Sequence, residues 1–268
     1  MPDIEDARAP RELDVSRATA ARMYDYYLGG KDNFAADREA AEAVLAAAPE
    51  VRPIAVENRR FLQRAVRYLA REAGIRQFLD LGTGLPTQGN VHEIAQAAAP
   101  DARVVYVDSD PIVLVHARAL LAGTGTTAVL TADLRDPDTV LTDPQVRSLI
   151  DFDEPVAVLL AAVLHFVPDV DEPHRLVRQY VGATAPGSHL VVSHVTGDTR
   201  PASAGGAEKA YRNTANPATL RSLPDIERFF SGLDLVEPGV VPVPAWRPDA
   251  GTVPAENIWM YGGVARKP

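Results

Sequence analysis

The chain has 268 residues, a formal net charge of −9 and no cysteine. The acidic balance argues against a general binder of nucleic acids or of anionic membranes, and the lack of cysteine excludes disulfides and thiolate chemistry. The N-terminus has no apolar run, and no segment approaches the ~18 apolar residues of a membrane span. We therefore expect a cytoplasmic protein with one domain, with or without an extension.

The N-terminal part of the chain lacks the strand and helix alternation that follows it. Residues 1–16 are polar and contain two prolines, which predicts a flexible N-terminus. Apolar residues at helical spacing then predict three helices, which end near residue 28, cover 37–48 and cover 56–73. Residues 17–74 are therefore interpreted as a helical extension, and residues 75–268 as the main domain.

Residues 24–34 form an unusual segment with three tyrosines in four positions, two glycines and a short polar run. One interpretation is aromatic packing of an added helix on the core, and composition alone favours it. The other interpretation is a lid over a bound ligand. The candidates for ligand contact are then Tyr24, Gly30, Asp32 and Asn33.

The next feature is a strand followed by a glycine turn. Residues 78–81 form an apolar strand that carries Asp80, and Gly82 and Gly84 follow before a helical run. Strand, glycine turn and helix are the first unit of a nucleotide-binding α/β fold, because glycine lets the backbone approach a ligand closely. A structural turn without a ligand is the alternative.

Two further predicted strands also end in acidic residues. Residues 104–107 lead into Asp108 and Ser109, and residues 128–131 lead to Asp133 and Leu134. Because the carboxyl ends of parallel strands meet at one edge of a sheet, three carboxylates are expected there. A carboxylate at the end of the second strand is placed to bind both ribose hydroxyls of an adenosine.

Two histidines are expected at the same edge. Residues 155–163 predict a central strand buried on both faces, and His165 follows it. His165 is a candidate general base, and a hydrogen bond to a loop is its alternative role. Residues 187–195 predict a fifth strand that carries His194, for which a core position is preferred over a catalytic role. The six histidines of the chain are not spaced as metal ligands.

Residues 196–222 interrupt the alternation, with only a short helix expected over residues 208–213. A long irregular segment in a compact domain is usually functional or disordered, and the position of this one predicts a cap over the acceptor site. Tyr211 and Arg212 are the candidates for contact with a substrate, and surface packing is the alternative. A short helix and strands over 233–243 and 258–265 are expected to complete the chain.

The glycine turn discriminates between two cofactors that carry adenosine, NAD and S-adenosylmethionine. An NAD site uses three glycines in the pattern G-x-G-x-x-G, but Thr87 stands at the third position. Asp80 would also face the NAD pyrophosphate and repel it. The same carboxylate suits the ammonium and sulfonium groups of S-adenosylmethionine.

Five segments carry a resemblance to a known family. They are residues 22–34, 80–86, 163–167, 236–241 and 246–248. In them the chain resembles class I S-adenosylmethionine-dependent methyltransferases, and more closely the S-adenosyl methyltransferase family of high-GC bacteria. The resemblance covers nearly the whole chain and favours the lid interpretation of the tyrosine-rich segment. Pro86 departs from the general class I glycine pattern but is normal for the narrower family.

The resemblance implies a fold and a cofactor. The fold is α/β, a Rossmann-like sheet of seven strands with an antiparallel C-terminal hairpin, preceded by the helical extension. The cofactor is S-adenosylmethionine. By resemblance, Asp80 and Gly82 would serve its methionyl end, Asp108 its ribose, and Asp133 and Leu134 its adenine edge, while Ala161 and Ala162 would allow close approach. Gly84 and Ser109 are further expected cofactor contacts.

The implied reaction is methyl transfer to a small-molecule acceptor, with no nucleic acid, membrane or metal involved. One alternative is a sensor or interaction protein that binds S-adenosylmethionine without catalysis. A second and less favoured alternative is an NAD-dependent oxidoreductase.

Overall fold

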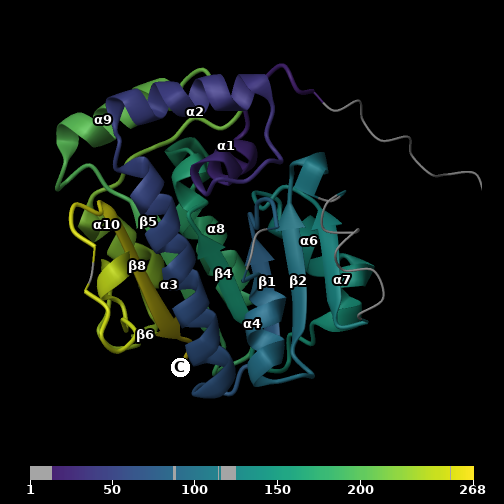
Figure 1. Ribbon diagram of the computed structural model, residues 1–268. Helices are drawn as coiled ribbons and strands as arrows, with labels where there is room; N and C mark the ends of the chain where they lie inside the picture. Colours follow the sequence, from purple (N-terminus) through teal and green to yellow (C-terminus); the bar gives the residue numbers. More distant parts are fainter. Residues whose placement is uncertain (1–13, 87–88, 114, 116–124, 254) are drawn as a thin grey trace, which may run out of the picture.

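The fold is built on one mixed β-sheet. The structure, a computed structural model, describes residues 14–268 except 87–88, 114, 116–124 and 254. The strand order is β3-β2-β1-β4-β5-β8-β6, and β7 also pairs with β8 (Figure 1). The strands are β1 (Gln77–Leu81), β2 (Arg103–Asp108), β3 (Thr127–Thr131), β4 (Ala157–Ala161), β5 (His189–Val195), β6 (Asp234–Leu235), β7 (Val241–Pro242) and β8 (Met260–Arg266).

Strands β1 to β5 pair in parallel, and β8 runs antiparallel to β5. The central strands β1, β4 and β5 are almost entirely buried, as expected for parallel strands with helices on both faces. This confirms the predicted α/β class I methyltransferase fold with an antiparallel C-terminal pair. The carboxyl ends of the parallel strands therefore lie at one edge.

The sheet contains eight strands, whereas seven were predicted. The strand expected over residues 233–243 is divided into two-residue strands, β6 and β7, which both pair with β8. Pro238 and Gly239 stand between them. Because proline has no N–H to donate to a ladder, a continuous strand cannot form there.

Two hydrophobic clusters fill the two faces of the sheet. Phe78 of β1 faces the cluster under α3 (Val51–Arg71) and α4 (Val91–Ala98). Leu79 and Leu81 face the other cluster, because successive side chains of a strand alternate. Figure 1 shows the helices of this second face behind the sheet. They are α6 (Pro137–Thr142), α7 (Pro144–Leu149) and α8 (Pro173–Gly182).

A third layer lies across the carboxyl ends of the strands. Figure 1 shows it at the top, formed by α1 (Ala20–Tyr27), α2 (Ala35–Ala47) and α9 (Pro201–Tyr211). The helix expected over residues 208–213 is therefore longer and begins at Pro201, and the prediction of irregular structure is wrong for residues 201–207. A Cβ on Gly206 would lie 3.0 Å from the Cβ of Ala47, so the small residue allows α9 to pack closely on α2.

The remaining elements are short. They are α10 (Leu223–Glu227) and the 3-10 helices Leu164–Phe166, Asp169–Asp171, Arg228–Phe230 and Val243–Ala245. Residues 1–13 of the predicted flexible N-terminus lie outside the described residues. Among the helices that the structure describes, none has the length and apolar character required to span a bilayer.

Candidate active site

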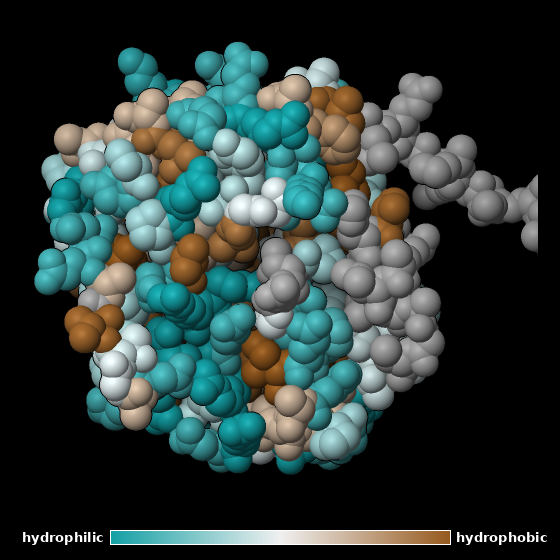
Figure 2. All heavy atoms as spheres, in the orientation of Figure 1, coloured by the Kyte–Doolittle hydropathy of each residue, from teal (hydrophilic) through white to brown (hydrophobic). Residues whose placement is uncertain are grey.

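A cavity of about 680 Å³ lies between the strand ends and the layer of α1 and α9. Residues from the ends of β1, β2, β4 and β5, from the segment after β3 and from the start of β8 line it. Figure 2 shows apolar and polar surface side by side around a hollow below the upper helices. The volume is within the ~300–1,000 Å³ typical of small-molecule sites.

The three predicted carboxylates meet in this cavity. Asp80, Asp108 and Asp133 all line it, together with Ser109 and Leu134. Their strands are neighbours in the order β1, β2, β3, which brings their ends together. Asp133 is paired with Arg135 at 2.6 Å. Asp80 and Asp108 have no ion-pair partner in the part of the chain that the structure describes.

Burial dominates the electrostatics of the two unpaired carboxyls. It raises the pKa of Asp80 to about 6, although Thr83 Oγ1 donates to Asp80 Oδ2 at 2.9 Å. It also raises the pKa of Asp108 to about 6, although the N–H groups of Gly84 and Asp110 donate to it at 2.8 and 2.9 Å. The nearby Arg59 lowers the pKa of Asp80, but burial outweighs it. A buried carboxyl at Asp80 and a half-buried one at Asp108, neither of them in an ion pair, favour a ligand with cationic or hydrogen-bond-donating groups.

The backbone around these carboxyls depends on glycine and on one strained residue. Gly82 has φ 71°, and a Cβ there would overlap the side chain of Val163. Gly84 has φ 67°, with open space where its Cβ would be. Ala162 after β4 has φ 55°, which is strained for a residue with a side chain, and Ala161 precedes it. All of these residues except Val163 were predicted site residues, and all line the cavity.

Tyr24 of α1 lines the cavity, and its hydroxyl belongs to a chain of hydrogen bonds that leads to the strand ends. Its hydroxyl donates to the Ala55 carbonyl at 2.9 Å and accepts from Asn58 Nδ2 at 2.9 Å. Asn58 Oδ1 accepts from Ser193 Oγ of β5, which in turn accepts from the N–H of Ala162 at 2.9 Å. These bonds fix α1 and α3 to the ends of β4 and β5.

The other predicted contacts of the tyrosine-rich segment do not line the cavity. Gly30, Asp32 and Asn33 instead surround the buried carboxylate of Asp25. The Asp32 N–H and Asn33 Nδ2 donate to Asp25 Oδ2 at 2.9 and 2.8 Å, and a Cβ on Gly30 would overlap the same carboxylate. The loop is therefore organised by Asp25 and not by a ligand.

The two histidines differ in their access to the cavity. His165 lines it and is 6% exposed, whereas His194 is fully buried and does not line it. His194 Nδ1 donates to the Val195 carbonyl at 2.6 Å, and its Nε2 accepts from Arg221 at 2.9 Å. Both nitrogens of His194 are in use, and burial lowers its pKa to about 3. His194 is thus a core residue, the interpretation preferred from the sequence.

The predicted substrate-binding pair is also separated. Tyr211 is buried, lines the cavity, and its hydroxyl lies 3.1 Å from that of Tyr27. Arg212 is exposed and does not line the cavity.

Arg59 of α3 was not predicted as a site residue. It lines the cavity, and its Nε is buried without a hydrogen-bond partner among the described residues. Its Nη2 donates to Asn90 Oδ1 at 3.2 Å. The sequence signal was weak, because Arg59 stands in a run of four polar residues, 57–60, within an amphipathic helix.

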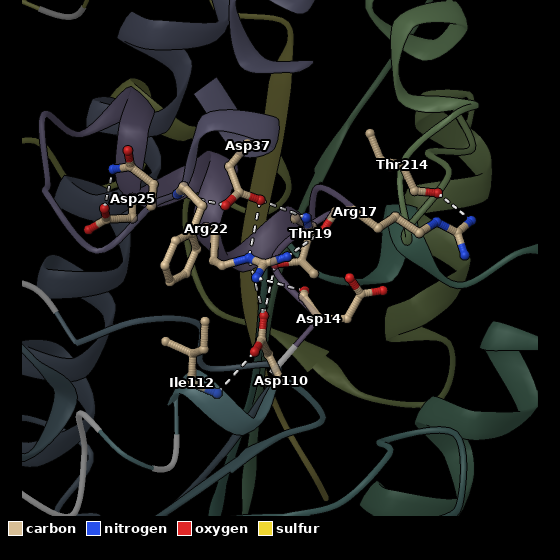
Figure 3. Close-up of polar contacts among 12 residues, drawn as sticks. Asp14, Arg17, Thr19, Arg22, Asp25, Asp37, Asp110, Ile112 and Thr214 are labelled. Atoms are coloured by element: carbon tan, nitrogen blue, oxygen red, sulfur yellow. Dashed lines mark hydrogen bonds and ion pairs between the residues drawn. The ribbon is translucent and has the colours of Figure 1, made fainter. Parts of the chain in front are cut away.

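A strap, residues 17–22, contributes to the lining of the cavity, and Figure 3 shows the polar contacts that hold it. At its first residue, Arg17 Nη2 donates to the Thr214 carbonyl at 3.0 Å. In its middle, Thr19 Oγ1 donates to Asp110 Oδ2 at 2.8 Å, close to the end of β2. At its last residue, Arg22, only 1% exposed, pairs with the buried carboxylate of Asp37 at 3.1 Å. The strap thus connects the β2 end to the segment after α9.

Comparison with known proteins places this geometry in a family. The chain matches the family described as S-adenosyl methyltransferase over residues 6–268. The chain belongs to the S-adenosyl methyltransferase family. It is therefore an S-adenosylmethionine-dependent methyltransferase, and this decides against the NAD alternative. No curated protein matches the sequence.

Solved structures agree with this assignment. A DUF574 family protein from Streptomyces avermitilis is 46% identical, with a TM-score of 0.91 over 96% of this chain and 100% of that one. A candidate methyltransferase from Thermobifida fusca is also 46% identical, with a TM-score of 0.91 over 98% of this chain and 99% of that one. The N-methyltransferase NodS from Bradyrhizobium japonicum is 16% identical with a TM-score of 0.50, covers 82% of this chain and 99% of that one, and shares the fold alone.

Proposed function

We propose that the cavity is the active site and that the methyl acceptor is a small molecule. The observation that carries this proposal is that the carboxylates of β1 and β2, the carboxylate that follows β3, and Gly82 and Gly84 line one cavity. The strand order puts these groups in one half of the cavity, at β3, β2 and β1. The other half, at β4, β5 and β8, is left for the acceptor.

The cofactor half fits S-adenosylmethionine. Asp80 matches the ammonium group, and Asp108 with Ser109 matches the ribose hydroxyls, because carboxylates accept these donors. Asp133 and Leu134 would border the adenine, with Ala161 and Ala162 beside the methionyl end. When bound, the cofactor supplies a methyl group activated by a sulfonium. The protein contributes orientation and exclusion of water, which are worth up to ~7–11 kcal/mol in well-oriented pairs.

Arg59 fits the carboxylate of the methionyl end. Its buried Nε has no partner among the described residues, which is costly for a cationic group unless a ligand completes the site. Asp80 and Arg59 both border the cavity, so they offer one negative and one positive group to a zwitterion. We therefore assign Arg59 to the carboxylate and Asp80 to the ammonium.

The Arg59→Gln variant tests this assignment. It should weaken S-adenosylmethionine binding at least about tenfold, because hydrogen bonds to charged groups contribute ~1.5–3 kcal/mol. Decarboxylated S-adenosylmethionine should bind the variant and the wild type equally in calorimetry. Arg60→Gln is the control, because Arg60 is exposed and pairs with Glu57. An equal loss for both ligands would refute the carboxylate contact.

The pH dependence of cofactor affinity follows from the two raised pKa values. Since the carboxyls of Asp80 and Asp108 have pKa values of about 6, they are largely protonated at about pH 5 and ionised at about pH 8. Only the ionised forms pair with the ammonium and accept from the ribose. Affinity should therefore increase at least about tenfold as pH rises through 6.

The unliganded protein should show the opposite trend. A carboxyl whose pKa is raised in the folded state favours folding when protonated, so stability decreases as pH rises from about 4 to about 6. Calorimetry at about pH 5 and about pH 8 checks the affinity. Asp80→Asn should reduce the pH dependence of the affinity and leave the part that is due to Asp108. An affinity that does not change with pH would show that these carboxylates do not bind the cofactor.

A further inference from the structure

The acceptor half of the cavity has walls of apolar and aromatic side chains. It lies over the ends of β4 and β5 and the start of β8, beneath α1, α3 and α9. Its walls include Tyr27, Ile54, Phe166, Val195, Tyr211 and Trp259. Such walls accommodate a flat apolar molecule. The polar atoms among them decide which functional group that molecule carries.

His165 is a neutral group in these walls. Burial lowers its pKa well below the usual value, and the nearby His194 and Arg221 act in the same direction. The guanidinium of Arg221 is paired with Asp169 at 2.7 Å and also donates to two backbone carbonyls. His165 therefore carries no charge near neutral pH, and its low basicity makes it a weak proton acceptor.

The position of the proton on His165 follows from its buried nitrogen. Nδ1 is buried and has no hydrogen-bond partner among the described residues. A proton there would leave an orphaned buried N–H, which is rarer in proteins than an unsatisfied acceptor. The favoured neutral form thus carries its proton on Nε2. Since the ring lines the cavity and Nδ1 is covered, Nε2–H is the group available to a ligand.

The tyrosine pair provides a second donor. The Tyr27 and Tyr211 hydroxyls lie 3.1 Å apart and share one hydrogen bond. Burial raises the pKa of Tyr27 and raises that of Tyr211 to about 12, so both remain protonated. Two hydroxyl protons and one shared bond leave one O–H without an acceptor among the described residues.

We propose that the acceptor is a flat, uncharged molecule with a phenolic or enolic hydroxyl, whose oxygen accepts hydrogen bonds from His165 Nε2 and the tyrosine pair. This inference rests on the proposed function. Donors stabilise the ionised oxygen, so the hydroxyl proton leaves to solvent before transfer. The oxyanion then forms the bond to the methyl carbon, and the carbon–sulfur bond breaks with its electron pair on sulfur. The negative charge of the oxyanion and the positive charge of the sulfonium are both lost in this step, and no protein base is required.

An amine acceptor fits these groups less well. An ammonium presents only N–H donors, and His165 Nε2–H cannot accept from them, so a tyrosine oxygen is the one acceptor among these groups. The carboxylate of Glu208 also lines the cavity, where its Oε1 accepts from the N–H of Leu220 at 3.4 Å, and the amine probe below tests whether it attracts an ammonium.

A carboxylic acid acceptor also fits less well. It would enter the cavity with a full negative charge, and the guanidinium of Arg221 already donates to Leu164 and Asp169.

Acetylnaphthol is a suitable probe, because its absorption shifts to longer wavelength when its hydroxyl ionises. Bound to protein saturated with S-adenosylhomocysteine, the hydroxyl should ionise at a pH about one lower than in water, since each donor favours the oxyanion. Acetylnaphthalene, which lacks the hydroxyl, should bind about three- to tenfold more weakly. Equal or tighter binding of naphthylmethylamine or naphthoate would overturn the proposed class.

Two variants of His165 separate a donor from a base. His165→Gln keeps an N–H near the position of Nε2 and should retain the spectral shift, whereas His165→Phe should abolish it and weaken binding about three- to tenfold. His189→Gln is the control. His189 is also buried with an unpartnered Nδ1, but it lies at the opposite end of β5. Loss of the shift in the Gln variant would refute the donor role.

The outcomes also separate the two proposals. Absence of S-adenosylhomocysteine binding in calorimetry would refute the proposed site itself. Normal binding of S-adenosylhomocysteine, together with no preference among the naphthyl probes, would refute only the inferred acceptor class.

Discussion

Replacing Arg22 with alanine should lower the free energy of unfolding by about 3–5 kcal/mol, the range for breaking a buried ion pair. Arg22 is 1% exposed, and Asp37, its partner at 3.1 Å, is fully buried. The substitution leaves the Asp37 carboxylate with only the N–H groups of Thr19 and Phe34. It also removes the hydrogen bond from Arg22 Nε to the Thr19 hydroxyl, which itself donates to Asp110.

Chemical denaturation measures the loss of stability, and two variants show its origin. Arg175→Ala removes the exposed pair between Arg175 and Glu172 and should change stability by about 0.5 kcal/mol or less. The double variant Arg22→Ala/Asp37→Ala should be more stable than the sum of the single variants, because no buried charge remains unpaired. A loss below about 1 kcal/mol in Arg22→Ala would show that the pair contributes little.

Hydrogen exchange locates the effect within the molecule. In Arg22→Ala, amides of the strap (residues 17–22) should exchange faster, while those of β1 and β2 should not change. In the wild type, S-adenosylmethionine should slow exchange in the strap, because a ligand stabilises the state that it contacts. The lid predicted for residues 24–34 therefore becomes a proposal about the strap, Tyr24 and Tyr27, the parts of residues 17–34 that line the cavity.

The carboxylates of the site could be predicted from the sequence because a local rule places them. Asp108 ends a strand of apolar residues, and parallel strands bring their carboxyl ends to one edge. Nothing beyond the order of the strands is required for that inference. The same rule brought His165 and Ala162 to the cavity.

Residues outside the strands could not be placed in this way. The glycine at position 30 is required by the Asp25 carboxylate, a contact within one loop that has the same sequence signature as a ligand contact. Arg59 faces the cavity only because α3 packs on the sheet with that orientation. In α9, Gly205 and Gly206 have low helix propensity and favoured an irregular segment, but packing against α2 overrides propensity.

The Gly82→Ala substitution should lower the free energy of unfolding by about 2–5 kcal/mol. A side chain at φ 71° adds about 1–2 kcal/mol of backbone strain, and its overlap with Val163 adds about 1–3 kcal/mol of overpacking. The turn at Gly82 also positions Thr83 and Gly84, which donate hydrogen bonds to Asp80 and Asp108. We therefore expect S-adenosylmethionine affinity to fall at least about tenfold in the fraction that remains folded.

Gly84→Ala is the matched comparison, because Gly84 has a similar φ of 67° with open space around its Cβ position. Gly84→Ala should lower the free energy of unfolding only by the backbone strain of about 1–2 kcal/mol. The double variant Gly82→Ala/Val163→Ala should recover part of the extra stability loss that the overlap causes in Gly82→Ala, since it removes the Cγ2 atom of Val163 that the new Cβ would overlap. Equal losses for the two glycine variants in denaturation would show that the Val163 side chain moves aside and that close packing behind the turn does not require glycine.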